Sequence, residues 1–139
     1  MAYASYQDVI DLHSERLVEA IADRDENDAI DMQSVDTALA GASAEIDARL
    51  SIRYQTPLVE TPEIVKMAAV EIAVYRLANN GGSLTDDIRK RYEDFITLMK
   101  DIAAGKANLG LPELDNGAGE GPADEFRAPV ARFGLVSRV

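Results

Sequence analysis

The stretch from Thr61 to Ala78 constrains the fold most, because it is apolar on nearly every side and has the start and stop signals of a helix. Thr61 is predicted to cap the first free N–H groups, and Pro62 suits the first helical position. Asn79–Gly82 tolerates left-handed backbone, so the helix is predicted to end there. Its four charged residues do not share one face: Glu63, Lys66, Glu71 and Arg76. Such a helix is usually packed on several sides, so we expect it to be the buried centre of the protein.

Two short helices are predicted before this central helix. Ser5 and Asp8 have the spacing of a capping box, with Asp in place of the usual Glu. Ser14 is the expected cap of the second short helix, in which apolar residues recur at helical spacing up to Ala22.

Two long helices complete the predicted all-α fold, a compact helical bundle around the central helix. One is expected over Met32–Arg53, with apolar residues in a single stripe. Gly41, in its narrow middle, predicts either a kink or a close contact with a neighbouring helix. The last helix is expected to begin after its cap Thr85 and to stop at Gly105, and it has the cleanest amphipathic pattern in the chain.

Composition argues against several classes of function. The chain has no Cys and a single His, His13, so thiolate metal sites, Cys nucleophiles and His-based triads lack their residues. His13 is interpreted as a surface or packing residue. No pair of carboxylates is marked by the sequence as sharing an apolar pocket that would separate their pKa values. We therefore predict no catalytic residue, no metal site and no cofactor, and a protein that is not an enzyme.

Charge and hydropathy limit the kinds of partner that the protein can have. Lys and Arg number 14 and Asp and Glu number 25, so the net charge is 14 − 25 = −11, which disfavours a grip on DNA phosphates. Met1–Ser5 is not the basic start of a signal peptide. No stretch reaches the ~20 apolar residues of a membrane span. We expect no membrane contact and synthesis in the cytoplasm.

The acidic segment Asp23–Asp31 partly matches the calcium-binding loop of an EF-hand. Oxygen-bearing side chains occupy four ligand positions: Asp23, Asp25, Asn27 and Asp31. Two required residues are missing, because Asp28 stands where the turn needs Gly and Ser34 stands where a bidentate Glu belongs. The favoured interpretation is a solvated turn in which Asp31 caps the next helix. The alternative is a small calcium-responsive binding module.

The composition changes at Pro112, which divides the chain into a helical domain, residues 1–111, and a C-terminal part, residues 112–139. Residues 112–122 are rich in Gly, Pro and acid, which is typical of a linker. Residues 126–139 contain three Arg and no acidic residue, which predicts an extended basic arm that docks on an acidic surface of a neighbouring chain. Its expected anchors are aromatic and Arg side chains, the usual anchors of interfaces: Phe126, Arg127, Arg132 and Phe133.

Short blocks follow one another through the helical part in a specific order: Tyr6–Val9, Ala42–Leu50, Arg53-Tyr54, Pro57-Leu58, Ile72–Leu77, Arg91–Asp94 and Ile102–Gly105. In this order and spacing they resemble the Mu-like phage and prophage family of small head–tail connector proteins, up to about Leu111. The chain departs from the family's pattern at Leu12–Glu15 and at Val74-Tyr75.

The resemblance implies a structural virion protein: a connector or adaptor subunit in a homo-oligomeric ring at the neck of a tailed phage. The expected neighbours are the portal protein on one side and a tail-side neck protein on the other. DNA would pass through the channel without specific binding, and an acidic wall would suit this passage because like charges repel. A third interpretation of the acidic chain is a regulator that binds a basic protein.

Overall fold

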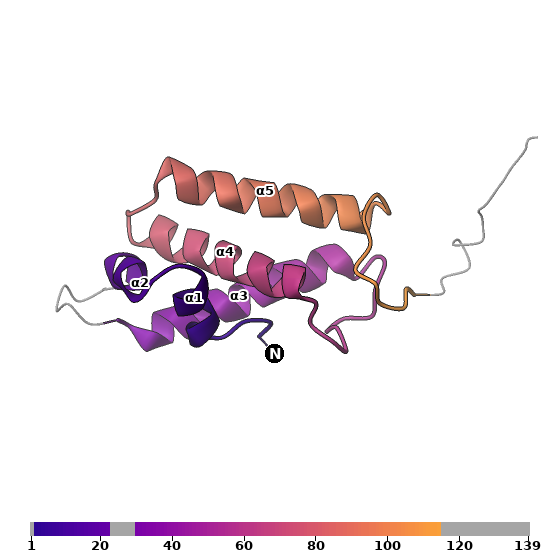
Figure 1. Cartoon of the computed structure of the whole chain (residues 1–139), viewed down its shortest axis with the longest axis horizontal. Helices are drawn as coiled ribbons and strands as arrows, with labels where there is room; N and C mark the ends of the chain where they lie inside the picture. The colour runs from indigo at the N-terminus through magenta and orange to yellow at the C-terminus, as the bar shows by residue number, and fades with distance from the viewer. Residues whose placement is uncertain (1, 23–29, 115–139) are drawn as a thin grey trace, which may run out of the picture.

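In residues 2–22 and 30–114, which the computed structural model describes, the chain forms five α-helices and no β-strand. The helices, shown in Figure 1, are α1 (Tyr6–Leu12), α2 (Glu15–Ala22), α3 (Met32–Leu50), α4 (Glu63–Asn80) and α5 (Asp86–Ala103). The predicted all-α helical bundle is confirmed.

Helix α4 is the centre of the bundle, as its sequence predicts. It contacts each of the other four helices, with α3 and α5 as its most extensive neighbours (Figure 1). Half of its 18 residues are buried: Val65, Ala68, Ala69, Val70, Ile72, Ala73, Val74, Leu77 and Ala78. Burial of this apolar surface is the main favourable term in forming the bundle.

Two charged residues of α4 face α1 and the residue that directly follows it. Lys66 Nζ lies 3.7 Å from a carboxylate oxygen of Asp8 in α1. Glu71 contacts the ring of His13, which directly follows α1, with 3.0 Å between Oε2 and Nε2. His13 is thus a packing residue, and its side chain is only 10% exposed. These pairs fasten α1 to the central helix.

Three of the predicted helix starts are confirmed in detail. Ser5 and Asp8 form a complete capping box at α1. Ser14 Oγ accepts a hydrogen bond from the Leu17 amide at 3.1 Å, and Thr85 Oγ1 accepts one from the Ile88 amide at 3.2 Å. Each bond satisfies an N–H group that the first turn of a helix leaves unpaired.

The predicted start of α4 is wrong by one residue. Pro62, with ψ at 152°, lies outside the helix as its N-cap, and no side chain caps this end. The Pro62 carbonyl accepts the first helical bonds, from the amides of Val65 and Lys66. Thr61 lies one position too far from the helix to cap it, because extended backbone at Pro62 moves the helix start to Glu63.

The predicted end of α3 is also too late. The helix stops at Leu50, and the amides of Arg53 and Tyr54 both turn back to the Leu50 carbonyl, at 3.0 and 2.9 Å. Arg53 lies outside the helix and contacts the segment that follows α5. Arg53 is thus engaged in distant contacts rather than in the last turn of α3.

Gly41 marks a close contact between helices α3 and α4. A Cβ at Gly41 would lie 2.9 Å from Nη1 of Arg76, so the guanidinium lies against α3 where Gly has no side chain. Of the two alternatives predicted at Gly41, the structure has the tight contact, within one continuous helix from Met32 to Leu50.

Tyr3 fastens the N-terminal segment to the end of α3 and to the α3–α4 loop. Its amide donates to Ser43 Oγ at 2.9 Å, and its phenol donates to the Asp47 carboxylate. The same phenol oxygen accepts from the Leu58 amide at 2.9 Å. Burial, followed by the hydrogen bond to Asp47, raises the pKa of Tyr3 to about 12.

This shift predicts a loss of stability in alkali. Because the folded state favours the neutral phenol, the extra stability is complete below about pH 10 and is lost as the pH rises towards about 12. The loss is expected to reach about 3 kcal/mol. Denaturant unfolding of the native chain and of Tyr3→Phe at both ends of this pH range measures it. If the difference between the two chains does not narrow at high pH, the pKa assignment is wrong.

Candidate assembly site

The predicted interface residues Phe126, Arg127, Arg132 and Phe133 lie outside the residues that the structure describes. The arm and its anchors therefore remain predictions. The described chain ends at Leu114, and the structure does show how the segment leading there is held.

Arg53 is the centre of that attachment. Its Nε and Nη2 donate to both carboxylate oxygens of Glu113, at 2.9 and 2.7 Å. Its Nη1 donates to the main-chain carbonyls of Ile102, at 2.6 Å, and of Ala107. The paired hydrogen bonds hold the pKa of the Glu113 carboxyl below its usual value. One guanidinium thus joins the α3–α4 loop, the end of α5 and the segment after it.

Two hydrogen bonds donated by main-chain amides reinforce this attachment. The Leu114 amide donates to the Arg53 carbonyl at 2.9 Å, and the Leu109 amide donates to the Tyr54 phenol at 3.1 Å. The chain is therefore held through Leu114 at the end of the bundle where α3 terminates (Figure 1). The chain after Leu114 therefore begins at a position that is hydrogen-bonded to the α3–α4 loop.

Three exposed apolar side chains belong to the segments that meet here. Ile52 is 68% exposed and Val59 is 80% exposed, and both belong to the α3–α4 loop. Leu114, which is 39% exposed, is bonded to the same loop through Arg53. We call these three residues the exit surface. Such exposed apolar side chains can be buried if another chain docks on them.

A second polar cluster joins the three long helices around Glu45. Its Oε1 accepts from Arg76 of α4 at 3.0 Å, and its Oε2 accepts from the Tyr92 phenol of α5 at 3.0 Å. Tyr92 stacks on Tyr75 of α4, with ring centroids 4.0 Å apart. Burial, and then the bond to Glu45, raises the pKa of Tyr92. The cluster sets how α5 lies against α3 and α4.

Glu45→Gln is expected to lower the free energy of unfolding by about 1–3 kcal/mol, because it removes the charge that assists these hydrogen bonds. Glu93→Gln is the matched control, since Glu93 is exposed on α5. Its expected change is within about 0.5 kcal/mol. Denaturant unfolding of both variants measures the difference. Equal effects would show that the Glu45 cluster contributes nothing beyond surface charge.

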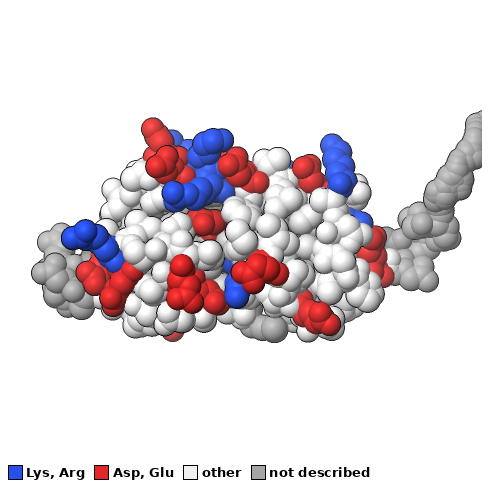
Figure 2. Space-filling model, viewed as in Figure 1, with Lys and Arg blue, Asp and Glu red and all other residues white. Residues whose placement is uncertain are grey.

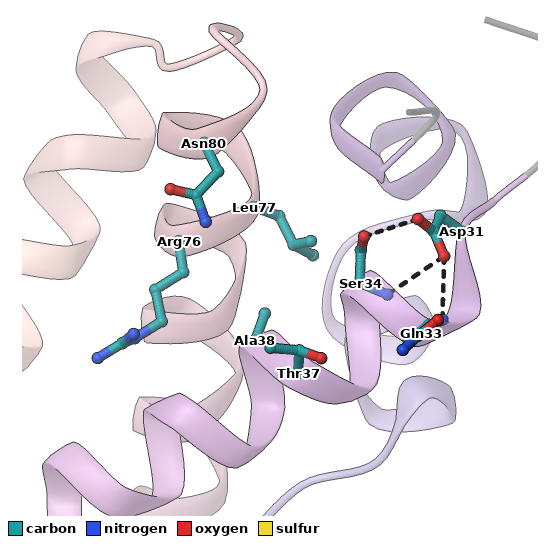
Figure 3. Close-up of a pocket in the computed structure, with 8 residues that line it drawn as sticks. All are labelled: Asp31, Gln33, Ser34, Thr37, Ala38, Arg76, Leu77 and Asn80. Carbon is teal, nitrogen blue, oxygen red and sulfur yellow. Dashed lines mark hydrogen bonds between the residues drawn. The ribbon is translucent and has the colours of Figure 1, made fainter. Parts of the chain in front are cut away.

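A shallow hollow lies between the start of α3 and the end of α4 (Figure 3). Asp31 lies at its edge, and its carboxylate accepts from the amides of Gln33 and Ser34 and from Ser34 Oγ. Figure 3 shows Leu77 and Ala38 between this cap and Arg76. The hollow is lined by side chains of mixed character, and its one carboxylate serves as a helix cap. The prediction that Asp31 caps α3 is confirmed.

The calcium prediction rests on three residues outside the described part of the chain: Asp23, Asp25 and Asn27. Within the described part, no cluster of three or more His, Asp or Glu side chains is placed to hold a metal ion. The calcium-responsive module therefore stays a prediction. Titration calorimetry with millimolar calcium tests it, because a true site gives saturable heat that Asp23→Ala removes.

The surface is acidic, with its basic groups concentrated in places. On the face in Figure 2, Lys and Arg gather over α5, with Asp and Glu beside them, whereas acidic groups are spread over the whole face. Arg89 pairs with Asp86 and Lys90 with Asp94, so part of this basic cluster is neutralised within α5. None of the described helices combines the length and the apolar composition needed to cross a bilayer.

Sequence reasoning missed the two centres of this architecture, Arg53 and Glu45. Both stand inside the blocks that carry the family resemblance. Apart from the i,i+4 pair of Glu45 with Arg49, the partners that join separate elements are 31 to 60 residues away in the chain, so no local pattern indicates them.

The described residues form a small helical bundle. Polar clusters around Arg53 and Glu45 join its separate helices and segments. The family follows from comparison. Residues 3–127 match the family described as Bacteriophage Mu, Gp36, and the chain belongs to this family of Mu-like phage proteins.

Two relatives agree with this assignment. The chain is 34% identical to the Mu-like prophage FluMu protein gp36 of Haemophilus influenzae over 113 residues, which cover 81% of this chain and 79% of that protein. It is 31% identical to Gene product J of Escherichia phage Mu over 100 residues, which cover 72% of this chain and 67% of the relative. These similarities identify a phage protein.

Proposed function

We propose that this protein is a head–tail connector subunit, which forms a homo-oligomeric ring between the portal and the tail of a Mu-like phage or prophage particle. Membership of the Mu family supports the phage setting. The resemblance of its helical blocks to small connector proteins supports the place in the particle. In this proposal the protein is located in the virion and acts without catalysis.

The exit surface is the observation that carries the proposal. Val59 is 80% exposed and Ile52 is 68% exposed, and both belong to the α3–α4 loop. Leu58 of the same loop is buried in the core. In a closed ring each subunit meets the next through two different patches. An apolar surface on a loop that is hydrogen-bonded to the bundle at Arg53 and Leu58 supplies one such patch, because less chain has to be ordered on binding.

The charge of the chain suits the same role. A net charge of −11 repels DNA phosphates, so a ring built from such subunits lets DNA slide through its channel. A regulator that binds a basic protein would use the same charge, but it would have no place in a particle. Whether the protein is found in purified particles therefore distinguishes a connector from such a regulator.

Gold-labelled antibody against the protein, applied to purified particles, tests the proposal by electron microscopy. Label is expected at the junction of head and tail. Label along the tail, or particles that carry no label while the protein is abundant in the cytosol, would overturn the connector assignment.

A further inference from the structure

A hollow of about 490 Å³ lies beside the N-terminal segment and α3, and none of the three exit-surface residues lines it. We call it the N-terminal hollow. Its lining combines aromatic, aliphatic and acidic side chains, including Ala2, Tyr3, Tyr6, Asp8, Asp36 and Leu39. Its aromatic and aliphatic side chains offer contact to an apolar group, and its carboxylates offer charge.

The two carboxylates of the hollow differ in their hydrogen-bond and ion-pair partners. Asp8 accepts bonds from the amide and hydroxyl of Ser5 and lies 3.7 Å from Lys66 Nζ. Asp36 is exposed and makes no ion pair with any described residue. Tyr6, half-buried, and Leu39, buried, provide apolar contact near both carboxylates. An Arg in this hollow would meet a free carboxylate and an aromatic face together, the arrangement in which Arg binds well.

The chain itself contains a segment with the complementary chemistry. Residues 126–139 contain Arg127, Arg132 and Arg138 and no acidic residue, so they carry a charge of +3. The rest of the chain then carries −11 − 3 = −14. Two of the Arg residues have Phe neighbours, Phe126 and Phe133, so each pair can fill an apolar hollow while its guanidinium meets a carboxylate.

The length of the intervening chain permits this contact. Leu114 is held at the end of α3, and residues 115–125 extend at most ~3.6 Å each, so they span up to ~40 Å. This reach is more than the diameter of a small helical bundle, which lets the segment reach an adjacent molecule. In a ring, a segment that leaves one subunit at a fixed point meets the same surface on each following subunit.

We propose that the N-terminal hollow is the acceptor for residues 126–139 of a neighbouring copy of this chain. The choice of a neighbouring copy rests on the proposed ring. The contact is heterologous, since the segment of one subunit binds the hollow of the next, and it therefore closes around the ring.

Cysteine cross-linking of the purified full chain tests this acceptor directly, because the native sequence has no Cys. The variant Ala2→Cys with Ala131→Cys puts one thiol at the hollow and one beside Arg132, and keeps every Arg, Phe and Asp of the proposed contact. Mild oxidation is expected to give a ladder of covalently joined copies on a non-reducing gel. The control, Ser83→Cys with Ala131→Cys, moves the first thiol to the exposed α4–α5 turn.

A charge-reversal variant provides a second, independent test. Adding Asp36→Lys to the hollow variant is expected to lower the ladder yield about tenfold, the change that corresponds to ~1.4 kcal/mol of binding. Glu93→Lys, the same change of charge on α5, should leave the yield unaltered.

Two results would overturn the proposal. One is a ladder no stronger than that of the Ser83 control. The other is a single chain that migrates faster than the reduced form, which would show that the segment binds the hollow of its own chain. Either result leaves the connector assignment standing if antibody label is found at the neck, so the two proposals fail separately.

Discussion

A chain that ends at Pro122 is expected to fold and yet to be absent from assembled particles. Within residues 2–22 and 30–114, the buried core runs from Tyr3 to Ile102, and the apolar residues packed against it extend to Leu111. Truncation at Pro122 removes none of them and also leaves the Arg53–Glu113 bonds in place. It does remove the basic segment, 126–139, which we propose as the link to a neighbouring subunit.

Incorporation is measured by complementing particles that lack the protein with either the native or the truncated chain. We expect loss of at least about tenfold in the amount bound, which corresponds to ~1.4 kcal/mol per contact and grows with the number of contacts. Circular dichroism and denaturant unfolding establish that the truncated chain remains helical and stable. The matched control carries residues 126–139 in a scrambled order, with unchanged length and charge. Normal incorporation of the truncated chain would reject the role of the arm.

Replacing Arg53 with Ala is expected to lower the free energy of unfolding by about 2–4 kcal/mol, the largest effect that we expect from one polar side chain here. Most of this loss comes from the carbonyls of Ile102 and Ala107, which lose their donor at the partly buried end of α5. The ion pair with Glu113 contributes less, because that carboxylate is 42% exposed and water screens it.

The Arg53→Ala variant also has a local signature. Hydrogen exchange at the amides of Leu109 and Leu114 is expected to speed up more than exchange in α4, because both amides bond to the Arg53–Tyr54 pair. Arg53→Lys should recover only part of the stability, since an ammonium cannot donate to Glu113 and to both carbonyls in the same geometry. Arg16→Ala, at an exposed site on α2, is the control and should change stability within about 0.5 kcal/mol. Equal exchange throughout the chain would contradict the proposed attachment.

The features that the sequence predicts well are those that depend on near neighbours. The caps at Ser5, Ser14 and Thr85 involve residues at most three positions apart, and all three form as expected. The buried centre at α4 follows from its composition, because an apolar surface on every side leaves only a central position.

The features that the sequence misses depend on distant residues. Thr61 was a reasonable cap by local rules, but the extended backbone of Pro62 places the helix start beyond its reach. The end of α3 was misplaced because Arg53 is drawn to residues near Glu113, 60 positions away. The Glu45 cluster brings together three helices in the same way. Such contacts are set by packing, which no periodicity in one segment reveals.

The candidate site, too, has a part that the sequence indicates and a part that only the structure shows. Composition alone indicates that residues 126–139 are a basic apolar segment in an acidic chain. It does not indicate where the acceptor lies, because the N-terminal hollow joins Tyr3 and Tyr6 with Asp36 and Leu39 from a separate helix. The exit surface likewise becomes visible only when Leu114 is seen to bond to the loop that carries Ile52.

The connector assignment is tested most directly by counting copies of the protein in purified particles. Particles induced from the source strain are digested, and peptides of this chain and of the portal are quantified by mass spectrometry against labelled standards. The connector assignment predicts several copies per particle, in a fixed ratio to the portal that is the same in every preparation. Particles that contain none of the protein, while the host cytosol holds it in abundance, would contradict it.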